Sequence, residues 1–85
     1  MMESLAVQRK RNARREKLGD LMRDARAAEG LTQEEAAEKL LFHRASLSKM
    51  EAGTQEIPVE TFLAMVKLYK MELDALLKSW GYRFF

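Results

Sequence analysis

The sequence contains no cysteine, a single proline and a single histidine, and these shortages exclude several classes of site. Without cysteine the chain has neither a disulfide staple nor a thiolate ligand for a metal. His43 has no second histidine and no carboxylate cluster at ligand spacing, so we expect no metal site and no cofactor. No nucleophile is paired with a base, so we do not expect an enzyme.

Long apolar runs are also missing. No segment approaches the length of a membrane span, and the N-terminus lacks the apolar region of a signal peptide. We therefore expect a cytoplasmic protein of a bacterial type with no membrane partner. With 85 residues the chain makes one small domain, which buries only about 60% of its unfolded surface. Oligomerisation would add stability to so small a core.

Basic residues are concentrated at the N-terminus. Residues 1–17 have a charge balance of +4, whereas the rest of the chain has a balance of −2. The cations expected to attract a polyanion such as DNA are Arg9, Lys10, Arg11, Arg14 and Arg15. Because this segment has no sustained apolar stripe, it is predicted to be either a disordered basic arm or a solvated extension of the first helix. The plain alternative is a tail that only aids solubility.

The segment from Leu31 to Gly53 predicts two short helices joined by a tight turn. Thr32 and Glu35 form the S/T-x-x-E pattern of a capping box, which marks a helix start. Apolar residues then recur at helical spacing, at Ala36, Ala37 and Leu40. The small side chain of Ala37 lets a second helix cross closely.

The second of these helices is predicted over residues 44–51, with Leu47 and Met50 facing inward. Phe42 in the preceding turn is expected to be buried, and Gly53 can adopt the positive φ that ends the helix. The outward residues are Arg44, Ala45, Ser48 and Lys49. Arginine can bond guanine bidentately, serine suits several base edges, and an alanine methyl can touch thymine. We interpret this face as a DNA-reading surface; the alternative is an ordinary solvated helix face.

These motifs resemble the lambda-repressor and Cro-like helix-turn-helix domains, also called the xenobiotic-response-element (XRE) family, over residues 18–77. The matching parts are Arg26 in ARAAEGLTQ, the helix TQEEAAEKL, Leu47 and Met50, Glu51 followed by Gly53, and the downstream segment IPVETFLAMVKLYKMELDALL. The resemblance implies an all-α fold, a bundle of five helices in which the second motif helix enters the major groove of DNA.

The resemblance also implies roles for single residues. Arg26 is expected to pair with Glu51 and so lock the first helix to the recognition helix. Gln33 is expected to reach a DNA phosphate. His43 stands where the family prefers serine or threonine, and is expected to cap the recognition helix weakly or to touch a phosphate. Leu41 stands where the family has a small residue, and a left-handed backbone at leucine costs about 1–2 kcal/mol.

Three further helices are predicted around the motif, completing a domain over residues 18–78. The first spans residues 18–30, and its inward face consists of Leu18, Leu21, Met22 and Ala25. The fourth opens at Pro58, and its inward face consists of Phe62, Met65, Val66 and Tyr69. A short fifth helix contains Leu73, Leu76 and Leu77.

Residues 79–85 form an aromatic tail whose alternation is typical of a strand. Exposed, its rings would make a large apolar patch. We expect a dimer interface formed by Leu76, Trp80, Tyr82, Phe84 and Phe85; the alternative is that the tail folds back on its own core. A dimer would set two recognition helices in successive major grooves, about 34 Å apart.

The sequence therefore predicts a sequence-specific DNA-binding transcriptional regulator, and most simply a homodimeric repressor of a short palindromic operator. Small regulators of this kind are encoded by plasmids and phages. Two alternatives stay open. The chain could be an antitoxin that also binds a toxin through its tail, or a protein-interaction adaptor that has lost DNA binding.

Overall fold

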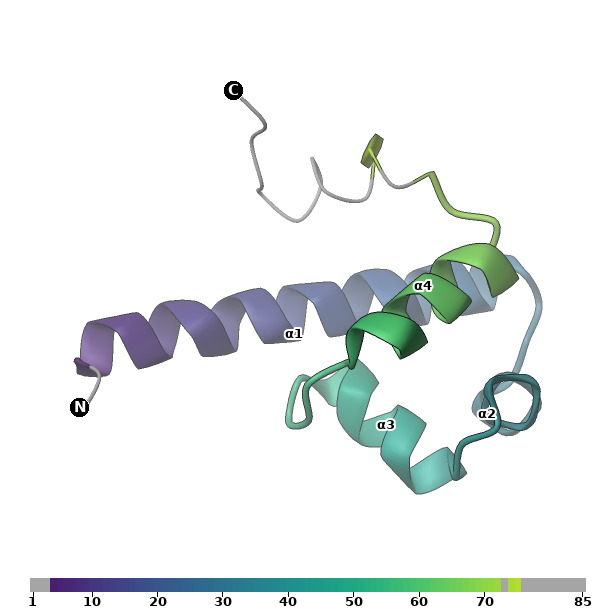
Figure 1. Ribbon diagram of the computed structural model, residues 1–85, viewed down its shortest axis with the longest axis horizontal. Coiled ribbons are helices and arrows are strands. Elements are labelled where there is room, and N and C mark those ends of the chain that lie inside the picture. The colour runs from purple at the N-terminus through teal and green to yellow at the C-terminus, as the bar shows by residue number, and fades with distance from the viewer. Residues whose placement is uncertain (1–3, 73, 76–85) are drawn as a thin grey trace.

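Four helices make up the part of the chain that the computed structural model describes, residues 4–72 and 74–75 (Figure 1). They are α1 (Leu5–Ala28), α2 (Gln33–Leu40), α3 (Arg44–Ala52) and α4 (Val59–Leu68). These residues include no strand, which confirms the all-α prediction for this part of the chain. The predicted fifth helix falls almost entirely, and the aromatic tail entirely, outside the described residues.

All four helices contribute buried side chains to one core, in which α1 packs on α3 and α2 packs on both α3 and α4. Its most fully enclosed side chains are Met22, Leu47, Met50 and Met65. Leu18, Ala36, Ala37 and Tyr69 complete the buried cluster. Three of the four largest buried side chains are methionines, whose flexible thioethers can fill the irregular space between short helices. The inward stripes predicted for the motif helices are confirmed, whereas Phe42 packs against the core but is only half-buried.

The first helix is much longer than the predicted span of residues 18–30. It begins at Leu5, where the Ser4 side chain caps it by accepting a hydrogen bond from the Val7 amide at 3.2 Å. The segment up to Lys17 is rich in alanine, arginine, lysine and glutamate, which all favour helix. Of the two alternatives predicted for the basic segment, the structure shows the helical extension of α1, from Leu5 onward.

A close approach of two backbones fixes how α1 crosses α3. A Cβ added at Gly19 would overlap the carbonyl oxygen of Glu51 and lie 2.7 Å from that of Met50. Gly53, with φ of 80°, ends α3 directly against α1, where an added Cβ would lie 2.7 Å from the Cα of Glu16. The two glycines allow the end of α3 to rest on the middle of α1.

Candidate nucleic-acid interface

The outward face of α3 carries the side chains that the sequence assigns to DNA. Arg44, Ala45, Ser48 and Lys49 are all exposed. Leu47 and Met50 on the opposite face are buried, so the helix cannot rotate about its axis without opening the core. The amphipathic pattern of nine residues therefore presents these four side chains to solvent in a fixed row.

The turn between α2 and α3 has the strained backbone that the sequence predicts. Leu41 adopts a left-handed conformation, with φ of 61° and ψ of 41°, and 91% of its surface is exposed. The Phe42 amide donates to the Ala37 carbonyl at 2.8 Å, closing a Schellman-type turn. Because this bond fixes the chain direction, α3 leaves the turn at a set angle to α2.

His43 does not cap α3 with its side chain. Its backbone is extended, as at other N-cap positions, but the imidazole makes no cap hydrogen bond. The prediction of a side-chain cap is therefore wrong, because the imidazole is turned outward and exposed. The first amides of α3 consequently have no side-chain acceptor from His43.

Arg26 on α1 and Glu51 on α3 are brought together as the resemblance implied. The Arg26 guanidinium donates to the carboxylate of Glu51 from Nε at 2.7 Å and from Nη2 at 3.1 Å. Its remaining arm, Nη1, donates to the Leu31 carbonyl at 2.8 Å. The side chains are 12% and 3% exposed, so this bidentate pair is nearly sealed from water. Hydrogen bonding to Glu51 raises the pKa of Arg26.

Gln33 also contacts the ion pair of Arg26 and Glu51. The sequence analysis did not predict this contact. Its side-chain Nε2 donates to Glu51 at 2.9 Å. Gln33 is the first residue of α2, held in place by the predicted capping box: Thr32 and Glu35 exchange hydrogen bonds of 3.1 Å. The bond from the Thr32 amide is the main reason that the pKa of Glu35 is lowered. The carboxylate of Glu51 thus joins α1, α2 and α3.

Arg44 lies beside this network. A shallow depression at the starts of α2 and α3 is lined by Arg26, Thr32, Gln33, Glu34 and Arg44. The buried pair that fixes α1 to α3 is therefore next to the first residue of the exposed α3 face.

The Tyr69 hydroxyl is also buried, and it has no hydrogen-bond partner. Burial, followed by the charge of Glu51, raises the pKa of Tyr69 to about 12.

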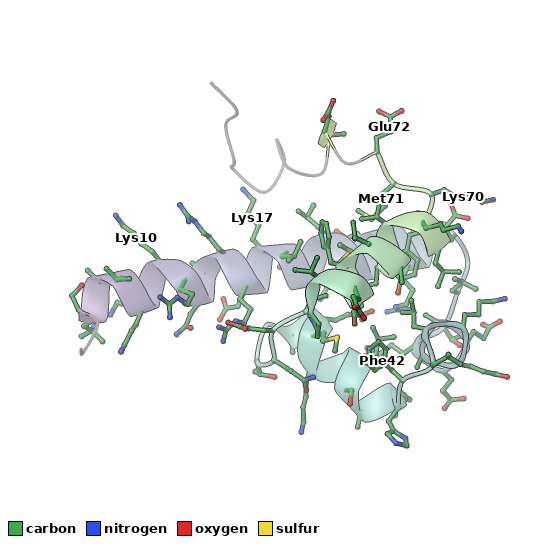
Figure 2. The ribbon with its side chains drawn as sticks, in the orientation of Figure 1. Lys10, Lys17, Phe42, Lys70, Met71 and Glu72 are labelled. Carbon is green, nitrogen blue, oxygen red and sulfur yellow. The ribbon has the colours of Figure 1, made fainter. Side chains whose placement is uncertain are left out.

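At least two of the basic residues of α1 point away from the α3 face. Figure 2 shows Lys10 and Lys17 pointing to the side of α1 opposite α3. Arg15 bonds Glu56, in the segment between α3 and α4, at 2.9 Å. The cations that line one groove with Glu56 are Lys10, Arg11, Arg14 and Arg15, whereas Arg9 does not line it.

The residues predicted to form the dimer interface, Leu76, Trp80, Tyr82, Phe84 and Phe85, lie outside the described residues. Within residues 4–72 and 74–75, no group of three histidine or acidic side chains is placed to hold a metal ion. In the same residues no helix combines the length and the apolar character that crossing a membrane requires.

Comparison with known proteins agrees with this architecture. Residues 17–80 match the family described as a helix-turn-helix domain. The chain is 38% identical over 60 residues to the HTH-type transcriptional regulator ImmR of Bacillus subtilis (strain 168), an alignment that covers 71% of this chain and 47% of ImmR. The chain thus spans about half the length of that relative. The match confirms the resemblance drawn from the motifs: the chain belongs to the helix-turn-helix domain family.

Proposed function

We propose that this protein regulates transcription by binding a specific duplex sequence through the outward face of α3. The observation that carries the proposal is the exposed row of Arg44, Ala45, Ser48 and Lys49 on a helix held by the buried Glu51 network. A recognition helix must hold its base-reading groups in a fixed position, and α3 is held near its C-terminal end by the bonds to Glu51 and along its length by the buried Leu47 and Met50. The relative ImmR is named as a transcriptional regulator, which agrees with the same role here.

The most economical form of this function is a homodimer acting as a repressor at a palindromic operator. Two copies would place their α3 helices in successive major grooves, and the half-sites would then be about 10 base pairs apart. The aromatic residues 80–85 supply the contact between copies in this proposal, since aromatic side chains are enriched at interfaces.

The basic segment of α1 adds attraction toward DNA through its charge. The balance of +4 over residues 1–17 is dense enough to raise the local potential within about 10 Å at ordinary salt. Deleting residues 1–15 should weaken binding to all sequences and flatten the dependence of affinity on salt. If the dependence of affinity on salt is unchanged, this segment does not contribute to DNA binding.

Selection from a pool of random duplexes with the purified protein tests the main proposal. We expect enrichment of an inverted repeat whose half-sites have the spacing of one helical turn. A variant in which Arg44, Ser48 and Lys49 are replaced by alanine should enrich nothing. If the unaltered protein enriches no sequence even at low salt, the domain serves as a protein-interaction adaptor and the proposal fails.

Sedimentation tests the dimer separately. Replacing Phe84 and Phe85 by alanine should shift the protein toward monomer. Leu5→Ala, which also removes an exposed apolar side chain, should leave the mass unchanged. A stable dimer in the double variant would assign the interface to another surface.

A further inference from the structure

One face of α4 stays apolar beyond the part that packs in the core. Val59 and Leu63 lie one turn apart on this face and are 74% and 54% exposed. Phe62 and Val66 lie beside them, and both are only partly buried against the core. We call these four residues the α4 strip. Single exposed apolar residues are common, but neighbours at helical spacing indicate a surface that another element covers.

Two opposite charges lie along one edge of the α4 strip. Glu60 and Lys67 are seven residues apart, close to two turns of helix, so both lie on the same edge. Both are exposed, and neither forms an ion pair with another described residue. An occupant of the strip therefore meets a negative charge in the first turn of α4 and a positive charge in its last turn.

A second copy in the antiparallel orientation would match both charges. A two-fold axis just after Leu63 places Glu60 of each copy level with Lys67 of the other, because both residues are about 5 Å along the helix from the axis. The same axis brings the two Leu63 side chains together and sets Val59 of each copy beside Val66 of the other. The strip is therefore complementary to itself, as a closed two-fold contact requires.

Other occupants match the strip less well. Residues 76–85 contain Lys78 and Arg83 and no aspartate or glutamate, so their side chains could pair with Glu60 but would repel Lys67. Duplex DNA would be repelled by Glu60, and its phosphate oxygens make no use of aliphatic side chains. A second copy is the occupant that offers a partner to both charges.

We propose that the α4 strip binds the α4 strip of a second copy in an antiparallel, two-fold arrangement. This inference rests on the homodimer of the proposed function and adds a contact surface to it. A standard interface buries about 800 Å² on each partner, which is more than one partly buried face of a ten-residue helix supplies. The α4 contact therefore acts together with a second contact, which the proposed function places in residues 80–85.

Sedimentation velocity of the full chain over a range of concentrations tests the proposal. The variant Val59→Ser with Leu63→Ser should raise the dissociation constant of the dimer about tenfold or more, because apolar surface is no longer buried. The matched control is Leu5→Ser with Val7→Ser, which also removes one leucine and one valine that are exposed, but on α1. It should leave the dissociation constant unchanged. Circular dichroism of each variant checks that the helices are intact.

Exchange of the two charges tests the antiparallel register. Glu60→Lys alone sets two cations against each other on both sides of the axis and should weaken association about tenfold. Lys67→Glu alone should do the same with two carboxylates. The double variant, Glu60→Lys with Lys67→Glu, restores opposite charges in each pair and should associate within about twofold of the parent. An effect of either substitution on the fold of its own copy would not be reversed in this way.

Three results would overturn the proposal. The first is a parent chain that is monomeric at every concentration. The second is an unchanged dissociation constant in Val59→Ser with Leu63→Ser, or no recovery in the charge exchange. The third is a change that Val59→Ser with Leu63→Ser causes in the emission of Trp80, the only tryptophan, while the protein is monomeric, which would show residues 76–85 on the strip of their own copy.

Failure of the proposed function gives a different pattern. If the selection from random duplexes enriches nothing while the α4 variants still weaken the dimer, DNA reading fails and the α4 contact stands. If replacing Phe84 and Phe85 dissociates the dimer while the α4 variants do not, the homodimer of the proposed function stands and the α4 contact fails.

Discussion

Gly19 on α1 packs directly against the backbone carbonyl groups of Met50 and Glu51 at the end of α3, where a methyl group does not fit. The contact joins backbone to backbone, so no side chain can move aside to make room. It places the guanidinium of Arg26, two turns further along α1, within reach of the Glu51 carboxylate. The close packing at Gly19 therefore helps to set the angle between α1 and α3.

The first prediction concerns this contact. Gly19→Ala should lower the free energy of unfolding by about 1–3 kcal/mol, the usual cost of overpacking, although alanine favours helix by about 1 kcal/mol. Urea denaturation measures the change. Gly30→Ala is the control: Gly30 has φ of 73° but open space around it, so only the backbone cost of about 1–2 kcal/mol applies. A Gly19→Ala protein as stable as the parent would show that α1 and α3 are not closely packed.

Breaking the buried ion pair should cost more. Glu51→Leu leaves the Arg26 guanidinium nearly buried without its carboxylate, and the expected loss of stability is about 3–5 kcal/mol. Replacing Arg26 by leucine as well removes the uncompensated charge and should recover part of that loss. The double-mutant cycle by urea denaturation gives the coupling free energy. Strictly additive losses would contradict a direct interaction.

Relief of the turn should stabilise the protein. Leu41→Gly removes the left-handed strain of about 1–2 kcal/mol at an exposed side chain that packs on little. Glycine also makes the unfolded chain more flexible, so the expected net gain is about 0.5–1 kcal/mol. Leu41→Ala keeps the strain and should give no gain. Thermal unfolding of both variants distinguishes the outcomes, and a loss in Leu41→Gly would mean that the leucine side chain stabilises the turn.

The unpartnered Tyr69 hydroxyl gives a prediction that depends on pH. At neutral pH, Tyr69→Phe should raise the free energy of unfolding by about 1 kcal/mol, because a buried donor without an acceptor is removed. Folding raises the pKa of Tyr69 to about 12, from the value of 10.0 that is ordinary for an exposed tyrosine. Stability linked to this group is therefore complete below pH 10 and is lost as the pH rises toward 12. Denaturation from pH 8 to pH 12 should show a steeper alkaline loss in the parent than in Tyr69→Phe, and parallel curves would contradict this.

Features written in local sequence could be predicted. The capping box of Thr32 and Glu35 needs only three residues of spacing, and the buried positions of α3 follow from helical periodicity. The left-handed strain at Leu41 followed from the resemblance, because the family has a small residue at this position. Periodicity alone did not identify the pairing of Arg26 with Glu51, which came from the family pattern.

Features that depend on packing partners could not be predicted. The close contact at Gly19 joins residues more than 30 positions apart, and the only local signal was a glycine among strong helix formers. Gln33 could be placed at a helix start, but its bond to Glu51 requires α3 to lie beside it. The sequence could not show whether α1 extends to Leu5. Helical propensity without an apolar stripe is compatible both with a disordered arm and with a solvated helix.

The most direct test of the central claim is the ratio of affinities for the selected operator and for unrelated duplex, measured by fluorescence anisotropy at one salt concentration. Replacing Arg44, Ser48 and Lys49 together by alanine should lower this ratio by a factor of ten or more, because each base contact contributes about 1–3 kcal/mol of discrimination. The control is the double variant Lys17→Ala with Lys67→Ala. It also removes two positive charges, but from surfaces outside α3, and should leave the ratio unchanged. If the α3 variant keeps the ratio while both variants lose affinity equally, the outward face of α3 does not read DNA.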